Sequence, residues 1–117
     1  MIVAVDFDGC LSLGTRYPSL GRPNLALIQC LDQLHELGHT IILWTCREGR
    51  ELEDAVTWCK DYHVPIDYVN ENPPWVGFKS RKVVADWYID DLCISISDMK
   101  KIKAITTQAC LKKYGNF

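Results

Sequence analysis

The chain has 117 residues, of which 48% are hydrophobic and 24% charged, and its formal net charge is −2. This composition is typical of one globular domain with a buried core, so we expect a single domain over residues 1–117. The small net charge gives no general electrostatic argument for binding nucleic acid or an anionic membrane, and no apolar stretch has the length that a bilayer requires. Six cysteines occur without any C-x-x-C pair, which favours free thiols and a cytoplasmic location over disulfides.

The first predicted element is a buried strand over residues 2–5, where apolar and mostly β-branched residues follow one another. Asp6 and Asp8 come directly after it, and a period of two places them on the same side of the extended chain. Gly9 permits a sharp turn after them. Two converging carboxylates repel each other and favour a cation, and oxygen ligands favour a hard ion such as Mg²⁺.

A loop and a helix are expected next. Residues 10–22 contain two glycines and a proline, and we expect them to form a loop or small flap over the end of the first strand. A helix should begin after Pro23-Asn24 and end at Gly38. Its apolar face would consist of three leucines: Leu27, Leu31 and Leu34.

A second buried strand is predicted over residues 40–44, and Thr45-Cys46-Arg47 follow it directly. An amphipathic helix is expected over residues 51–62, with three side chains facing inward: Leu52, Val56 and Cys59. Residues 66–69 should form a short third strand, and residues 70–79 an irregular loop.

The last third of the chain begins with one predicted helical turn over residues 80–84, followed by a strand over residues 86–89 that ends in Asp90-Asp91. Ile94 and Ile96 alternate with serines, which indicates a short edge strand. Asp98 should cap a final helix with three side chains facing the core: Ile102, Ile105 and Ala109.

Strands and helices alternate along the chain. This order predicts an α/β fold, with a three-layer, Rossmann-like parallel sheet and helices on both faces. In such sheets ligands bind at the carboxyl ends of the strands, where Asp6, Thr45 and Asp90 are all expected. Each of these residues alone is also typical of a turn or a helix cap.

As a set, these residues resemble the four motifs of the haloacid dehalogenase superfamily: Asp6-x-Asp8-Gly9, a strand-end Thr45, a lysine near position 80, and Asp90-Asp91. The resemblance covers nearly the whole chain. The short gaps between the motifs leave no room for a cap domain, as in the small capless phosphatases of the superfamily. Cys10 departs from the family pattern, which usually has Thr or Val, and we expect only a backbone role there.

The resemblance implies a Mg²⁺-dependent phosphomonoester hydrolase. Asp6 would be the nucleophile that forms an aspartyl-phosphate, and Asp8 would act first as acid and then as base. The metal ligands would be the side chains of Asp6 and Asp90 together with the backbone carbonyl of Asp8. Asp91 would bind the metal directly or through water.

The resemblance also implies which residues bind the phosphate. Thr45 and the neighbouring Cys46 and Arg47 would contact its oxygens, and a lysine would balance its charge. We expect Lys82 rather than Lys79, because Ser80 can cap a helical turn that fixes the direction of Lys82. The substrate would be a small phosphorylated compound, with nucleotides and phosphorylated nucleic-acid ends also admitted by a capless site.

Two other functions fit parts of the sequence. A catalytically idle member of the same fold would serve as a binding module. His35 and His39 match the H-E-x-x-H motif of zinc peptidases. Gly38 lies between them, so the second histidine is expected to leave the helix and we favour a helix end over a zinc site.

Overall fold

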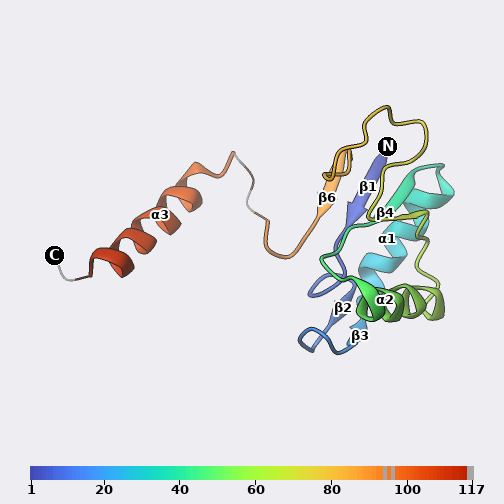
Figure 1. Ribbon diagram of the computed structural model, residues 1–117, viewed down its shortest axis with the longest axis horizontal. Coiled ribbons are helices and arrows are strands. Elements are labelled where there is room, and N and C mark those ends of the chain that lie inside the picture. The colour runs from blue at the N-terminus through green and yellow to red at the C-terminus, as the bar shows by residue number, and fades with distance from the viewer. Residues whose placement is uncertain (94, 96, 116–117) are drawn as a thin grey trace.

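The computed structural model describes residues 1–93, 95 and 97–115 (Figure 1). The edge strand predicted around Ile94 and Ile96 lies outside the described residues. A parallel sheet of four strands forms the centre, in the order β5-β4-β1-β6. These strands are β1 (Ile2–Val5), β4 (Thr40–Leu43), β5 (Tyr68–Val69) and β6 (Trp87–Ile89). The predicted α/β fold with a parallel sheet is confirmed.

Two helices pack on one face of the sheet. Helix α1 (Leu25–Glu36) begins where the Asn24 side chain accepts a hydrogen bond from the backbone N–H of Leu27. Helix α2 spans Gly49–Asp61. Both helices contribute to one core, in which alternate residues of β1 and β4 are buried against them: Val3, Val5, Ile41 and Leu43 from the strands, Ile28 and Leu31 from α1, and Ala55, Trp58 and Cys59 from α2.

The opposite face of the sheet has a smaller core. Ala4 and Ile42 pack there against Val83, which belongs to the loop before β6. The predicted helical turn over residues 80–84 is not found: the Ser80 hydroxyl donates to the carbonyl of Lys82 instead of capping a helix. Val83 reaches the sheet from this irregular loop.

The final helix, α3 (Met99–Tyr114), is present as predicted, and the Asp98 side chain caps it by accepting the N–H of Lys101. Its predicted packing on the core is wrong. The helix extends away from the sheet (Figure 1), and Ile105 is 46% exposed. The apolar spacing indicated a helix correctly, but it carried no information about what the helix packs against.

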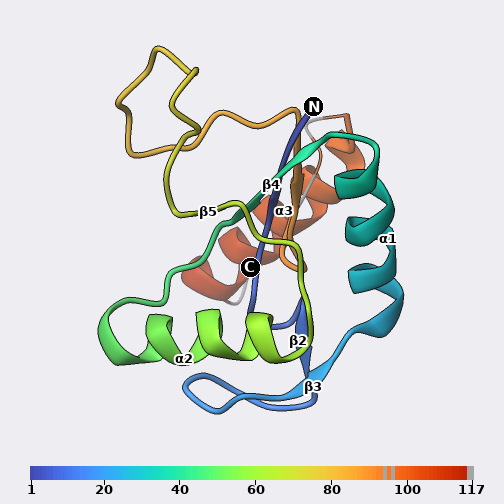
Figure 2. The ribbon, with the colours of Figure 1, turned by 90° about the vertical axis from the view of Figure 1, so that its right-hand side faces the viewer.

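The predicted flap, residues 10–22, contains a short antiparallel hairpin of β2 (Ser12–Leu13) and β3 (Arg22–Pro23). Figure 2 shows the hairpin beside α2 at one end of the sheet, while the loop before β6 lies at the other end. The indole N–H of Trp58 donates to the carbonyl of Gly21, which ties the flap to α2. Within the described residues, no helix combines the length and the apolar character needed to cross a membrane.

Candidate active site

Three carboxylates converge at the carboxyl ends of two neighbouring strands. Asp6 follows β1 and Asp90-Asp91 follow β6. These strands pair in parallel, and the N–H of Asp6 donates to the carbonyl of Ile89 at 2.9 Å. Carboxylate oxygens of Asp6, Asp90 and Asp91 therefore lie within 4.8 Å of one another. We call this set the acid cluster.

The carboxylates of the acid cluster repel one another. Burial raises the pKa of Asp6 from 3.8 to about 6; a backbone hydrogen bond at Phe7 opposes this shift, while the charges of Asp90, Asp91 and Asp8 add to it. A cation bound between these oxygens would reverse the repulsion. The donor set of carboxylate oxygens fits a hard divalent ion.

The turn after β1 leaves no room for a side chain at position 9. Gly9 has φ +77°, and an added Cβ would collide with the carboxylate of Asp91. Next to it, burial together with Asp6, Asp91 and Asp90 raises the pKa of the Cys10 thiol to about 11. The thiol therefore stays protonated at neutral pH, which excludes it as a thiolate nucleophile.

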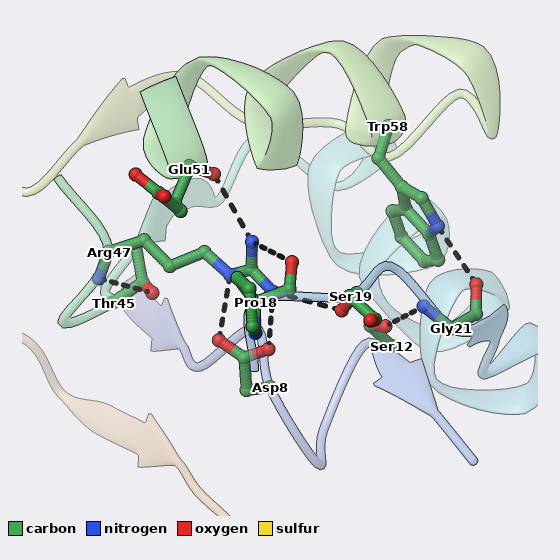
Figure 3. A network of polar contacts seen from close by, with 9 residues as sticks. All are labelled: Asp8, Ser12, Pro18, Ser19, Gly21, Thr45, Arg47, Glu51 and Trp58. Atoms are coloured by element: carbon green, nitrogen blue, oxygen red, sulfur yellow. Dashed lines mark hydrogen bonds and ion pairs between the residues drawn. The ribbon is translucent and has the colours of Figure 1, made fainter. Parts of the chain in front are cut away.

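Asp8 is held by Arg47, as Figure 3 shows. The guanidinium donates from Nε to Oδ2 at 2.8 Å and from Nη2 to Oδ1 at 2.7 Å. Its nitrogens also donate to three backbone carbonyls, those of Pro18, Ser19 and Glu51. Arg47 is only 2% exposed. Instead of facing a substrate, as predicted, it joins Asp8, the flap and α2.

Thr45 lies just beyond the end of β4, with Trp44 between them. Its backbone N–H donates to Oδ1 of Asn70 at 2.8 Å, and its carbonyl accepts from Nδ2 of Asn70 at 3.0 Å. Sequence analysis missed Asn70. It follows β5 with φ +53°, a left-handed conformation that asparagine tolerates, so an asparagine directly after a predicted strand was the available signal.

An open cleft of about 500 Å³ joins these features. Six of the predicted site residues line it: Asp6, Asp8, Thr45, Cys46, Asp90 and Asp91. The flap contributes Thr15, Arg16 and Tyr17 to its other wall. The structure thus brings most of the predicted site together from β1, β4 and β6. The Asp8 side chain borders the cleft without joining the acid cluster, so its predicted metal contact through the backbone stays a prediction.

Lys82 does not reach the cleft. The N–H of Asp86 donates to the carbonyl of Ile2, which places the preceding loop beside the start of β1, at the end of the sheet opposite to Asp6. Nζ of Lys82 lies 5.5 Å from the ring centroid of Tyr88. Lys79 belongs to the same loop. Strand β6 separates both lysines from the acid cluster.

Comparison with known proteins identifies a relative of this chain, but the description of that relative names no activity. A solved structure of a conserved protein from Bacteroides thetaiotaomicron has 35% sequence identity and a TM-score of 0.71, over 93% of this chain and 91% of that chain. The chain belongs to the same family as this Bacteroides protein. A structure from Vibrio cholerae has 25% identity and a TM-score of 0.48, over 92% and 98% of the two chains. No protein-family model and no curated protein matches this chain.

The two histidines of the H-E-x-x-H motif have different partners. Nε2 of His35 lies 2.9 Å from Oδ1 of Asp67, whereas Nδ1 of His39 lies 2.8 Å from the N-terminal amine. Gly38 has φ +91° and ends the helical run between them. Among the described residues, the acid cluster is the candidate metal group, and the two histidines do not form one.

Proposed function

We propose that this family member is a Mg²⁺-dependent phosphomonoester hydrolase of the haloacid dehalogenase type. The observation that carries the proposal is the convergence of Asp6, Asp90 and Asp91 in one cleft with Thr45. Phosphate esters are anionic and would be repelled by three carboxylates alone. The cluster therefore suits phosphate only when a cation is bound, held by Asp6, Asp90 and Asp91, and that cation would neutralise charge on the phosphoryl group.

Asp6 is the proposed nucleophile. A carboxylate oxygen of Asp6 attacks phosphorus, the bond between phosphorus and the leaving oxygen breaks, and an aspartyl-phosphate forms. Water then attacks the phosphorus of this intermediate, releasing inorganic phosphate and restoring the Asp6 carboxylate. The position of Asp6 at the end of a buried central strand keeps the attacking oxygen fixed.

Asp8 is suited to the second step as it stands. Both of its oxygens accept hydrogen bonds from Arg47, which fixes the direction of the carboxylate that would accept a proton from the attacking water. Donating a proton to the leaving oxygen in the first step requires one of the Arg47 bonds to open. The arrangement favours substrates whose leaving oxygen needs little assistance.

Thr45 supplies a hydrogen-bond donor for the phosphate. Its hydroxyl oxygen accepts the N–H of Arg47 at 3.2 Å, so the hydroxyl hydrogen remains for a phosphate oxygen. Asn70 fixes the Thr45 backbone on both sides and thereby its direction. Preorganised donors of this kind stabilise charge that develops in the transition state.

The test is release of inorganic phosphate from a panel of phosphorylated metabolites and end-phosphorylated oligonucleotides with Mg²⁺ present. Asp6→Asn keeps the shape and removes the attacking charge, so turnover should fall by about 10³-fold or more. Asp32→Asn, an exposed carboxylate on α1, is the matched control and should behave as the wild type. An Asp6→Asn variant within tenfold of wild type would overturn the proposal, and metal-dependent phosphate binding without hydrolysis would indicate an idle binding module.

A further inference from the structure

The flap presents an aromatic side chain at the cleft that the mechanism does not use. Tyr17 is 58% exposed and lines the same cleft as the acid cluster. Arg16 and Leu92 also line it, and Leu92 is 89% exposed. Large apolar side chains left in water beside a polar site are typical of ligand-binding surfaces.

The Tyr17 ring is held in place from one side. Its centroid lies 5.1 Å from Cζ of Arg47, whose guanidinium is also 4.9 Å from the ring of Phe7. Arg47 is fixed by Asp8 and donates to the carbonyls of Pro18 and Ser19, the two residues after Tyr17. The ring therefore keeps a set position relative to Asp8 while much of its surface remains open. A preordered ring loses little entropy when a ligand packs on it.

We propose that Tyr17 is a stacking platform for a planar group on the alcohol part of the substrate, so that nucleoside phosphomonoesters are preferred over sugar or alkyl phosphates. This inference rests on the proposed function, because it names the substrate class of the same cleft. A flat ring favours another flat ring, Leu92 adds apolar surface, and Arg16 adds a cation for a polar substituent. The aromatic face accepts any base, so no single nucleobase is specified.

The experiment compares adenosine 5′-monophosphate with ribose 5-phosphate, which has the same phosphate ester but no base. Wild type should show a kcat/KM higher by about tenfold or more for the nucleotide. Tyr17→Ala should remove this preference while changing the value for ribose 5-phosphate by less than about twofold. Tyr17→Phe keeps the ring and should keep the preference. Trp75→Ala, which removes an exposed aromatic side chain outside the cleft, is the matched control.

Calorimetric binding of the same two compounds, with Mg²⁺ present, separates the platform from the chemistry. If wild type hydrolyses no compound of the panel, the proposed function fails, yet tighter binding of the nucleotide that Tyr17→Ala abolishes would still support the platform. Equal binding and equal kcat/KM of the two compounds in wild type would overturn the inference. The inference would also be overturned if Tyr17→Ala lowered affinity and kcat/KM to the same extent for both compounds. That pattern would mean that Tyr17 only holds Arg47 in place.

Discussion

The acidic residues at the two ends of the central sheet have different surroundings. At the amino end, His35 contacts Asp67, and the Asp86 carboxylate accepts the N–H of Ile2. At the carboxyl end, Asp8 is paired with Arg47, but Asp6, Asp90 and Asp91 face one another. The acids at the amino end thus each contact a partner within the fold. At the carboxyl end three carboxylates repel one another, and a cluster of like charges in a cleft is typical of a functional site.

The largest effect is expected from removing the metal, because only the acid cluster at the carboxyl end should depend on it. Excess EDTA should abolish turnover, because the acid cluster would repel the substrate without a cation. In a calorimetric Mg²⁺ titration, Asp90→Ala and Asp91→Ala should each weaken binding by at least about tenfold. Asp86→Asn, at the other end of β6, should leave Mg²⁺ affinity unchanged. Full activity in EDTA would contradict the metal-dependent mechanism.

Replacing Arg47 tests how much its contacts with Asp8 and the flap contribute to stability. Arg47→Ala should lower the free energy of unfolding by about 2–3 kcal/mol, since it leaves Asp8 and three backbone carbonyls without their donor. Arg50→Ala, an exposed arginine in α2, should change it by less than about 0.5 kcal/mol. Urea denaturation measures both variants. Equal stabilities would show that the Arg47 contacts contribute nothing net.

A pH series in the metal-free protein tests the cost of ionising Asp6, which comes chiefly from burial and is increased by the neighbouring carboxylates. The folded-state pKa of Asp6 is about 6, above its ordinary 3.8, so folding opposes ionisation. This acid therefore costs no stability below about pH 4, a growing amount as the pH rises from 4 to 6, and a constant amount above that range. Asp6→Asn should raise the melting temperature at pH 7.5 in EDTA and leave it unchanged near pH 4. A variant that melts at or below wild type at pH 7.5 would rule out this account.

The smallest effect is expected for the two lysines at the amino end. Lys82→Ala and Lys79→Ala should each keep turnover within about twofold of wild type, because β6 separates their loop from the acid cluster. Steady-state kinetics with the best substrate of the panel decides this. A loss above tenfold in Lys82→Ala would restore the role that sequence analysis gave to this residue.

The predicted site residues that line one cleft share a local signal. Asp6, Thr45 and Asp90 each follow a run of strand-forming residues directly, and parallel strands end at the same edge, so a linear pattern was enough to bring them together. Lys82 does not lie with them, because the eight positions from Lys82 to Asp90 include the whole of strand β6. A strand is extended and holds its two ends apart.

The Arg47 network lay beyond sequence reasoning for a different reason. Asp8 and Arg47 are 39 residues apart, and nothing in Thr45-Cys46-Arg47 indicates that the guanidinium turns inward toward the flap. The same limit applies to α3, whose spacing predicted a helix but not its packing partner. Pairings between distant segments depend on the tertiary arrangement, which local propensity does not encode.

The pairing of β1 with β6 also sets the order of events during synthesis. Ile2 and Asp86, which hydrogen-bond at the start of these strands, are 84 residues apart. Strand β1 leaves the ribosome well before β6, so its β6 side stays uncovered until those later residues follow, and contacts of such long sequence separation form slowly. Asp6 meets Asp90 and Asp91 only after that step. A growing chain can thus bury β1 against β4 before β6 brings Asp90 and Asp91 to Asp6 and completes the acid cluster.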